Sequence, residues 1–348
     1  MNEICVRSSA LDGWRSQLTK CGYAPDRLEA IRTILPREQR GASPMPLSSF
    51  VDFSEHLVRE TRDVTIPWLV GTHYEISSLG PVGDAIRAST KVGSALHRFV
   101  EFFDLLQDCT DIRLECDERS ASLSYRILDP KIWPRHQDAM FSLGILAQIL
   151  RAGTTEGWDH VEFHFEAAQS EMTGNIERVV DAPCNFEADM NMLRFPVRIL
   201  DCALEPDFTN APIRELNATL ARKNRKTSLA ERLARVVYRD LDRLAIDQER
   251  VAREVGMSSR TMRRRLASEG SSFQQVLDEC RMRQAVFEFT TKPSLSIAQV
   301  ALRLGYSEHS TFTRAFRRWS GLSPQDYREK FPASSTDAIR KIRCPALS

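Results

Sequence analysis

Two stretches near the end of the chain repeat one plan, and no other feature of the sequence constrains the fold as strongly. Residues 251–266 and 300–316 each have the pattern of a helix that ends at a glycine, a short turn, and a second helix that begins at hydroxyl or acidic residues. Gly256 and Gly305 can adopt the left-handed backbone conformation that ends a helix within a residue or two. The pattern predicts two helix-turn-helix units.

The second helix of each unit has an apolar face and a polar face. Met262 and Leu266 are four residues apart, as are Phe312 and Phe316, so each pair is expected to point into its unit. The polar face that remains is rich in arginine, a side chain that can bond guanine O6 and N7 together in a major groove. The residues that this arrangement turns outward are Arg260, Arg263, Arg264, Ser310, Thr313, Arg314 and Arg317.

A long helix is expected between the two units. The pattern predicts it over 273–289, a length of about 25 Å at 1.5 Å per residue. A rigid spacer of that length could set two recognition helices in successive major grooves, roughly 34 Å apart. Helix starts are marked by Ser228, Ser272 and Ser296, each followed three residues later by Glu or Gln as in a capping box, and by Ser323 before a proline.

Charge divides the chain into two unlike parts. Residues 214–348 contain 27 lysine and arginine residues against 15 aspartate and glutamate residues, a net charge of +12. Residues 1–213 contain 21 against 32, a net charge of −11. A basic part suits DNA phosphates, whereas an acidic part is repelled by them. Only the second part is therefore expected to meet a polyanion.

The first two hundred residues mix helical and strand patterns, which predicts an α+β fold. A stretch with two prolines and few apolar residues, 204–212, reads as a linker or exposed loop, and every later segment up to Tyr327 has a helical pattern. In the first part, helices are predicted at 46–58, 92–106 and 140–150, the last ended by Gly153. Strands are predicted at 111–115, 120–127 and 159–165, and a further strand pair at 184–195.

Four segments follow from these boundaries. We expect an α+β sensing or dimerisation domain at 1–204 and a linker with connecting helices at 205–245. An all-α domain at 246–330 would hold the two helix-turn-helix units joined by the long helix. Residues 331–348 are expected to form a loose tail.

The second unit matches a longer pattern, in order, than a single helix-turn-helix requires. The matching residues are Ile297, Ala298, Ala301, Gly305, Tyr306, Phe312, Arg314, Phe316, Gly321, Ser323, Pro324, Tyr327 and Arg328. With them, residues 245–330 resemble the DNA-binding domain of the AraC/XylS family of bacterial regulators. The resemblance implies base or phosphate contacts at Arg260, Arg263, Arg264, His309, Ser310, Thr313 and Arg314, to which we add Ser259 and Arg317. The run 260–265 is richer in arginine than the family pattern, which indicates stronger phosphate binding or a G-rich site.

The N-terminal part carries a looser set of features. These are the helix at 91–107, the two strands after it, the alternating segment Val161–Phe165, and the segment from Cys184 to Leu193. With them, residues 15–200 resemble the arabinose-binding-type sensor domain of one subgroup of the same family. The resemblance implies a domain that senses a small molecule, supports dimer formation, or both. The name of the subgroup does not make the ligand a sugar.

Together these features predict a sequence-specific DNA-binding transcription regulator. Double-stranded promoter DNA is its expected partner, with RNA polymerase a further one if the protein activates transcription. The first expectation for the N-terminal domain is control by a small-molecule effector. The alternative is a domain that only forms a homodimer or binds a protein partner, and a third reading is an enzyme domain fused to a DNA-binding module. Arg113, Arg126 or Arg135 could hold an anionic effector, but the sequence prefers none of them, so the effector-binding residues stay unassigned.

The sequence gives no support to several other kinds of site. The eight cysteines include no Cys-x-x-Cys motif, which argues for reduced thiols rather than a zinc ribbon or a redox pair. His160, Glu162 and His164 share one strand face, but without a third ligand nearby an ordinary polar face is the better interpretation. There is no Gly-rich phosphate loop and no nucleophile elbow. We therefore expect no catalytic residues, no metal and no cofactor.

The sequence shows neither a membrane-spanning segment nor a secretory signal, a pattern that predicts a cytoplasmic protein. No run of eighteen or more apolar residues occurs, so no membrane span is expected. The N-terminus lacks the basic start and apolar core of a secretory signal. A bacterial cytoplasmic protein without membrane contact is the resulting expectation.

Overall fold

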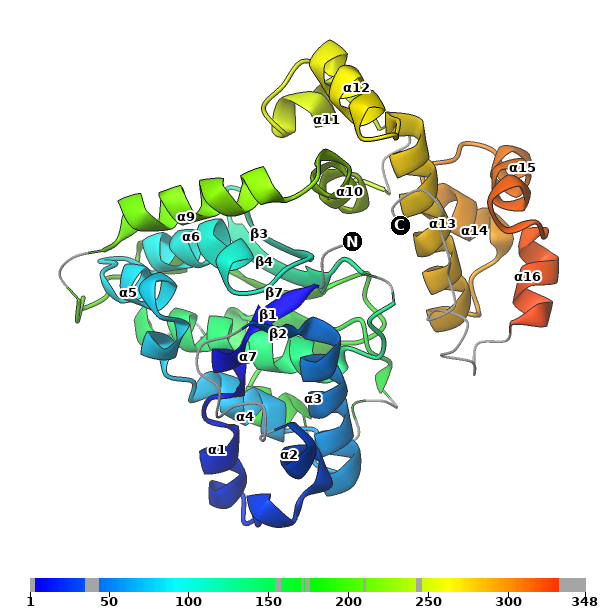
Figure 1. The fold of residues 1–348 in the computed structure, drawn as a ribbon. Helices are drawn as coiled ribbons and strands as arrows, with labels where there is room; N and C mark the ends of the chain where they lie inside the picture. The colour runs from blue at the N-terminus through cyan, green and yellow to red at the C-terminus, as the bar shows by residue number, and fades with distance from the viewer. Residues whose placement is uncertain are drawn as a thin grey trace. The chain divides into compact units, whose positions relative to one another are not determined.

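The chain divides into two compact units, coloured from blue to green and from green to red in Figure 1. The computed structural model describes residues 4–331 apart from 35–43, 130, 154–157, 170–171, 173–175, 209–210 and 242–245. We call residues 4–127 and 134–221 the sheet unit, and residues 128–133 and 222–331 the helical unit. The loose tail predicted at the C-terminus lies, apart from its first residue, outside the described residues.

The sheet unit combines two sheets with helices, which confirms the predicted α+β class. Its strands are β1 (Cys5–Arg7), β2 (Pro44–Pro46), β3 (Thr110–Cys116), β4 (Ser120–Ile127), β5 (Glu162–His164), β6 (Cys184–Asn185) and β7 (Asn191–Pro196). Its α-helices are α1 (Trp14–Lys20), α2 (Glu29–Ile34), α3 (Leu47–Thr61), α4 (Ile66–Thr72), α5 (Pro81–Arg87), α6 (Val92–Phe102), α7 (His136–Gly153), α8 (Ile176–Val180) and most of α9 (Ile213–Lys226). Shorter 3-10 turns are η1 (Ser8–Leu11), η2 (Pro25–Arg27), η4 (Ile76–Leu79), η5 (Phe103–Leu105), η6 (Trp158–His160) and η8 (Val197–Asp201).

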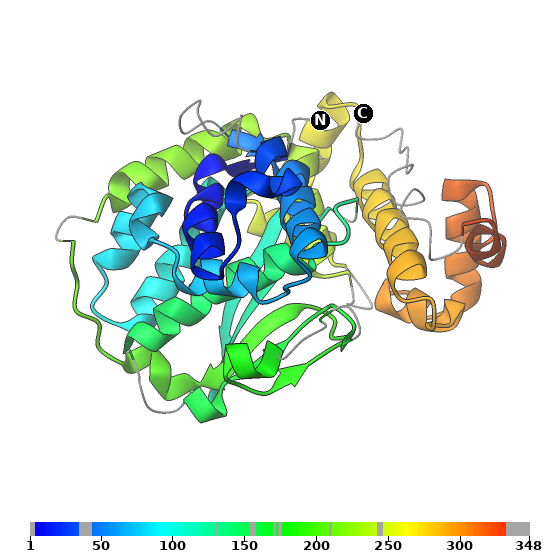
Figure 2. The same cartoon turned by 90° about the horizontal axis from the view of Figure 1, so that it is seen from below.

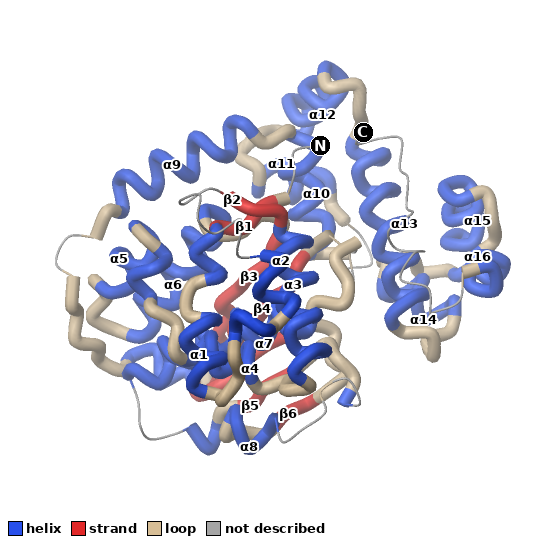
Figure 3. The backbone as a smooth tube through the Cα atoms, turned by 60° about the horizontal axis from the view of Figure 1, so that its bottom comes forward, coloured by secondary structure: helices blue, strands red, loops and turns tan. Residues whose placement is uncertain are grey.

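The larger sheet has five strands in the order β3-β4-β7-β5-β6. Strand β4 pairs antiparallel with β3 and with β7, and β5 pairs antiparallel with β7 but parallel with β6. In Figure 3 these strands, in red, run through the sheet unit with helices around them. Hairpins between strands that follow each other in sequence would not give this order, because β7 pairs with β4 and with β5 and not with its neighbour in sequence, β6.

Helix α7 forms the centre of the core because it is buried on nearly every side. Fourteen of its residues, from His136 to Leu150, are buried. It crosses α4 at a point where both helices have glycine: a Cβ on Gly71 would lie 2.3 Å from the carbonyl oxygen of Phe141, and one on Gly144 3.0 Å from the Cα of Gly71. Only residues without a side chain allow two backbones to approach so closely.

Most predicted elements of the sheet unit are present, with four differences. The helix predicted over 92–106 is an α-helix only as far as Phe102 and continues as the η5 turn. Helix α7 begins at His136, four residues before the predicted start. The segment predicted as one strand over 159–165 opens with the η6 turn, in which the Val161 N–H bonds the Trp158 carbonyl, so only Glu162–His164 form a strand. Strands β6 and β7 arise where a strand pair was predicted, but β5 lies between them.

The helical unit contains only helices and turns among its described residues. Helix α9 runs into it at residue 222. Its further helices are α10 (Leu229–Arg239), α11 (Gln248–Glu254), α12 (Ser259–Ser268), α13 (Phe273–Thr291), α14 (Ile297–Arg303), α15 (His309–Ser320) and α16 (Pro324–Lys330). Ser228 and Ser296 form complete capping boxes and Ser323 caps α16 before its proline, as predicted. Ser272 accepts a bond from the Gln275 N–H, which is only one of the two bonds of the capping box predicted there.

Helix α13 is two residues longer than predicted, because it continues to Thr291, and it lies in sequence between the two helix-turn-helix units. Its first half packs on α10, where Cys280 contacts the Ala234 carbonyl. Its second half packs on α14 and α15 (Figure 2). Residues 128–133, far away in sequence, also belong to this unit: the Trp133 ring lies edge-on to Phe287, with 5.1 Å between ring centroids. Among the described residues, no helix is long and apolar enough to cross a membrane.

Candidate nucleic-acid interface

The first helix-turn-helix unit is built from α11, a turn and α12. Gly256 ends α11 with φ +76°, the left-handed conformation that the sequence predicts. Ser258 caps α12 by accepting a hydrogen bond from the Thr261 N–H. Met262 and Leu266 are both 0% exposed, so they form the inner face of α12 as predicted.

The outer face of α12 is a row of arginines. The side chains of Arg260, Arg263 and Arg264 are exposed and make no hydrogen bond or ion pair with the described part of the chain. Ser259, the first residue of α12, is half-buried. Arg265 is also exposed and without a described partner, although the sequence prediction did not include it. Arg265 belongs to the arginine run 260–265, and this position in the sequence was the signal that could have placed it among the predicted DNA contacts.

The second unit is built from α14, a turn at Gly305 (φ +75°) and α15, and it has an aromatic core. Phe312 and Phe316 are both 0% exposed and face inward as predicted. Phe289 of α13 meets the Phe316 ring at 5.4 Å between centroids, and Tyr327 of α16 meets it at the same distance. Edge-to-face aromatic pairs of this kind fix the angle at which α15 is held.

The outer face of α15 mixes short polar side chains with arginine. His309, Ser310, Arg314 and Arg317 are exposed, and Thr313 is half-buried with its hydroxyl donating to the His309 carbonyl. Arg314 Nη2 lies 3.3 Å from the Thr311 hydroxyl, a neutral partner that leaves its charge uncompensated. The structure therefore brings the predicted residues of α15 together on one exposed face.

Several other arginines of the helical unit are paired with carboxylates. Arg250 Nη2 lies 2.8 Å from Asp240 Oδ2, and on α15 itself Arg318 Nη2 lies 2.8 Å from Asp278 Oδ2. Burial acts to raise the pKa of Asp240, but its hydrogen bonds with Arg250 and Arg239 and their positive charges hold that pKa low. The contrast matters because a paired arginine stabilises the fold, whereas an exposed, unpaired one is available to an anionic partner.

Arg328 has a structural role that the sequence did not indicate. Its guanidinium donates to the carbonyl oxygens of Leu295 and Pro293 and lies over the Phe289 ring. These contacts fasten α16 to the turn that precedes α14. Tyr327 and Arg328, which belong to the family pattern, therefore hold α16 against the rest of the second unit, so their role is to stabilise its fold.

In the sheet unit, two of the arginines considered for an anionic effector are paired with acidic side chains. Arg135 Nη2 lies 2.9 Å from Glu166 Oε1, with both side chains buried, and Arg113 forms an ion pair with Asp111. Burial lowers the pKa of Arg126, while Glu166 and Asp111 act to raise it. None of the three lines the apolar cavity of the sheet unit, whose single arginine is Arg7.

The histidine-bearing strand face has the predicted alternation. His160 and Glu162 are exposed and His164 is half-buried, whereas Val161 and Phe163 are buried. No group of three possible metal ligands occurs among the described residues.

Two family models match the chain. The first, described as the arabinose-binding domain of AraC transcription regulators at the N-terminus, matches residues 23–204, and a helix-turn-helix domain model matches residues 251–330. Together they span most of the sheet unit and both helix-turn-helix units.

Characterised relatives are similar over different shares of the chain. The ornithine utilization regulator of Pseudomonas aeruginosa is 27% identical over 82% of this chain and 86% of its own length. The HTH-type transcriptional regulator VirS of Mycobacterium tuberculosis is 30% identical over 49% of this chain and 48% of its own. A crystal structure of the transcriptional regulator CdpR from Pseudomonas aeruginosa covers 92% of this chain and 98% of its own, with 22% identity and a TM-score of 0.40.

Proposed function

Because this chain belongs to the AraC family of transcription regulators, we propose that it reads promoter DNA with the outer faces of α12 and α15 together. In this proposal Arg260, Arg263 and Arg264 of α12 meet one stretch of major groove. The α15 residues His309, Ser310, Thr313, Arg314 and Arg317 meet another, and Ser259 contacts the backbone at the start of α12. One chain then reads two segments of a single site.

One observation carries this proposal, the division of arginines into paired and unpaired groups. The second helix of each helix-turn-helix unit carries exposed arginines without a carboxylate partner among the described residues, and the inner faces of the same helices are fully buried. A cluster of exposed cations without internal partners is what phosphate and guanine recognition requires. Arg318, on the same helix as Arg314, has Asp278 as its partner and supplies a matched comparison.

The test uses the full chain and a DNA site enriched from a random pool. Arg264→Ala and Arg314→Ala should each weaken binding to that site by about 1–3 kcal/mol where the residue contacts a base. Arg318→Ala should change it by less than about 0.5 kcal/mol. Fluorescence polarisation on the selected site and on random DNA separates the roles, since equal losses on both assign an arginine to phosphate. Unchanged binding in both of the first two variants contradicts the proposal.

We also propose a role for each segment of the chain. Residues 1–204 would sense an effector, residues 205–245 would connect, and residues 246–330 would contact DNA in the bacterial cytoplasm. A small-molecule effector is favoured by the cavity described below. In the alternative, the first segment only forms a homodimer or binds a protein partner.

Ligand control and dimer-only control differ in a measurable way. An effector must bind the DNA-competent state with a different affinity from the other state, so DNA affinity must depend on effector concentration. A dimer-only domain gives DNA affinity that depends on protein concentration alone. Polarisation titrations at several protein concentrations, with and without a metabolite extract, distinguish the two.

A further inference from the structure

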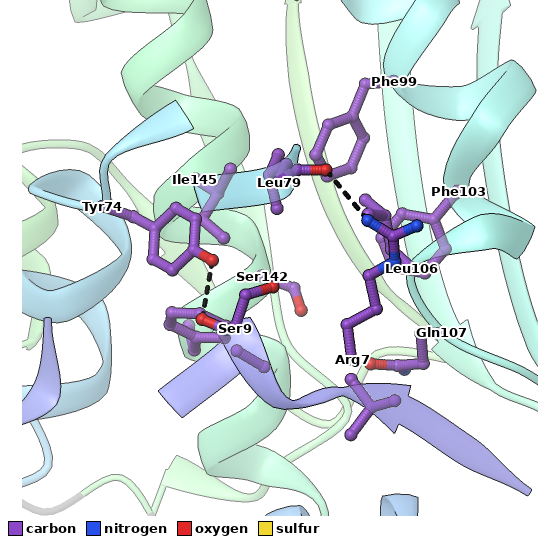
Figure 4. Close-up of a pocket in the computed structure, with 13 residues that line it drawn as sticks. Arg7, Ser9, Tyr74, Leu79, Phe99, Phe103, Leu106, Gln107, Ser142 and Ile145 are labelled. Atoms are coloured by element: carbon purple, nitrogen blue, oxygen red, sulfur yellow. Dashed lines mark hydrogen bonds between the residues drawn. The ribbon is translucent and has the colours of Figure 1, made fainter. Parts of the chain in front are cut away.

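The sheet unit contains a small, mostly apolar cavity between β1, α6 and α7. Its volume is about 40 Å³, room for about three water-sized groups. Aromatic and aliphatic side chains form most of its wall, among them Phe99, Phe103, Phe141 and Ile145. Figure 4 shows the Arg7 side chain entering from β1 with its guanidinium turned toward the Leu79 carbonyl.

The backbone of β1 fixes where Arg7 points. The Arg7 N–H donates to the Leu106 carbonyl at 2.9 Å, and Val6 forms a bridge with Gln107. On the far side the guanidinium lies against the backbone at Gly80, where a Cβ would come within 3.3 Å of Nη1. These contacts hold the cation at the cavity wall.

Arg7 has no counterion among the described residues. Its side-chain hydrogen bond is a long one, 3.4 Å from Nη1 to the neutral Leu79 carbonyl, and no carboxylate of the described residues forms an ion pair with it. Burial lowers the pKa of the guanidinium, which reflects the loss of water around it. A partly desolvated cation without an anionic partner is costly, and an anion that enters the cavity removes that cost.

Two further polar side chains at the wall, Tyr74 and Gln107, already have partners. The Tyr74 hydroxyl donates to the Ser9 carbonyl at 2.7 Å. Gln107 Nε2 lies 2.8 Å from the Thr110 hydroxyl and 2.7 Å from the Tyr125 hydroxyl, which occupies both of its N–H groups. The guanidinium is therefore the main donor that the cavity offers to a ligand.

We propose that this cavity binds a short-chain monocarboxylate, with its carboxylate on Arg7 and its hydrocarbon chain against Phe99, Phe103 and Ile145. A single cation matches a single negative charge, and a planar carboxylate fits the fork of a guanidinium. A sugar would leave most of its hydroxyls without partners against the apolar wall. That this ligand acts as the effector rests on the proposed function, whereas the binding site itself does not.

The first experiment measures binding to the full chain by isothermal titration calorimetry. The probes are the linear monocarboxylates from acetate to hexanoate, each with the amide of equal length as an uncharged control. At least one acid should bind, with micromolar to millimolar Kd as expected for so few atoms. Its amide should bind at least about 10-fold more weakly, as for the loss of a charged hydrogen bond.

Variants test whether carboxylate binding depends on Arg7. Arg7→Gln should weaken carboxylate binding at least about 10-fold, and Arg7→Lys should restore part of it. Arg32→Gln, an exposed arginine of the same unit, is the matched control and should bind as the wild type does. Ile145→Val removes one methyl group from the wall, so the preferred chain length should rise by about one carbon. Circular dichroism melts check that each variant is folded.

The outcomes separate this inference from the proposed function. If no acid of the series binds, or if folded Arg7→Gln binds as the wild type does, the carboxylate site is wrong even where the chain still binds its DNA site. If the acids bind through Arg7 but leave DNA affinity unchanged, the site stands and the effector role fails. Carboxylate binding that depends on Arg7 and follows the chain-length shift in Ile145→Val supports the inference.

Discussion

One group of arginines in each unit shows the two opposite uses of this side chain. In the sheet unit, the Arg135 and Glu166 side chains are 4% and 6% exposed and lie 2.9 Å apart. In the helical unit, the arginines on the outer face of α12 are exposed and have no partner in the described part of the chain. The same side chain therefore supports the fold in one unit and remains available for an anionic partner in the other. What surrounds a charge decides which of these roles it has.

The buried pair shows how the surroundings act. Burial alone raises the pKa of Glu166, but the charge and the hydrogen bonds of Arg135 outweigh it and lower that pKa overall. Asn191 completes the arrangement by donating to Glu166 Oε2 at 3.1 Å. Removing one member of such a network leaves an uncompensated charge inside the protein.

The largest expected effect follows from breaking this pair. Arg135→Met leaves Glu166 buried without its counterion, so the free energy of unfolding should fall by about 3–5 kcal/mol. Chemical denaturation followed by circular dichroism measures the loss. Lys91→Met, which breaks the exposed pair with Asp201, is the control and should cost less than about 1 kcal/mol. Equal losses in the two variants would remove the contrast between buried and exposed charges.

A second test uses Asp138, which is buried beside Tyr125. Burial raises the pKa of Asp138 to about 7, although the Tyr125 hydroxyl donates to its Oδ2 at 2.6 Å and acts in the other direction. The folded protein therefore holds a proton that the unfolded chain releases near pH 4. Stability should fall as pH rises from about 4 to about 7, by up to about 4 kcal/mol, and then level off.

Asp138→Asn should remove that part of the pH dependence. Melting temperatures at pH 5 and pH 8 measure it, and the difference between the two should be larger for the wild type than for the variant. Glu55, whose pKa burial also raises, is present in both proteins, and its charge adds to the rise in the pKa of Asp138 that the variant removes. An identical pH dependence in the two proteins would show that Asp138 is not held protonated in the folded state.

The smallest change in stability is expected on α12. Arg263→Gln removes an exposed charge without a described partner, so the free energy of unfolding should stay within about 0.5 kcal/mol of the wild type. If Arg263 contacts a phosphate, the salt dependence of DNA binding should become shallower by about one in log–log slope. A loss of stability like that of Arg135→Met would place Arg263 among the supporting arginines instead.

Features set by neighbours in sequence could be predicted from the sequence. Gly256 and Gly305 end their helices as expected, and Met262 and Phe312 face inward, because a glycine and a spacing of four residues act within a single turn. The serine caps are local in the same way. For this reason the amino-acid sequence alone predicts the two helix-turn-helix units and the residues on their outer faces.

Features set by distant residues could not be predicted. The sequence does not single out Arg7, because its surroundings come from Leu79 and Leu106, residues 72 and 99 positions away, and nothing near it in sequence marks it. Strand β5 lies between β6 and β7, a placement that depends on pairing across the sheet. The assignment of residues 128–133 to the helical unit, through Trp133 and Phe287, likewise has no local signal.

Hydroxyl-radical footprinting of the full chain on its selected DNA site tests the central claim most directly, that α12 and α15 each read DNA. The account predicts two protected tracts about one helical turn, or 10–10.5 base pairs, apart. Arg264→Ala should weaken protection of one tract, and Arg314→Ala should weaken protection of the other. A single tract, or two variants that weaken the same tract, would contradict the claim that both helices read the site.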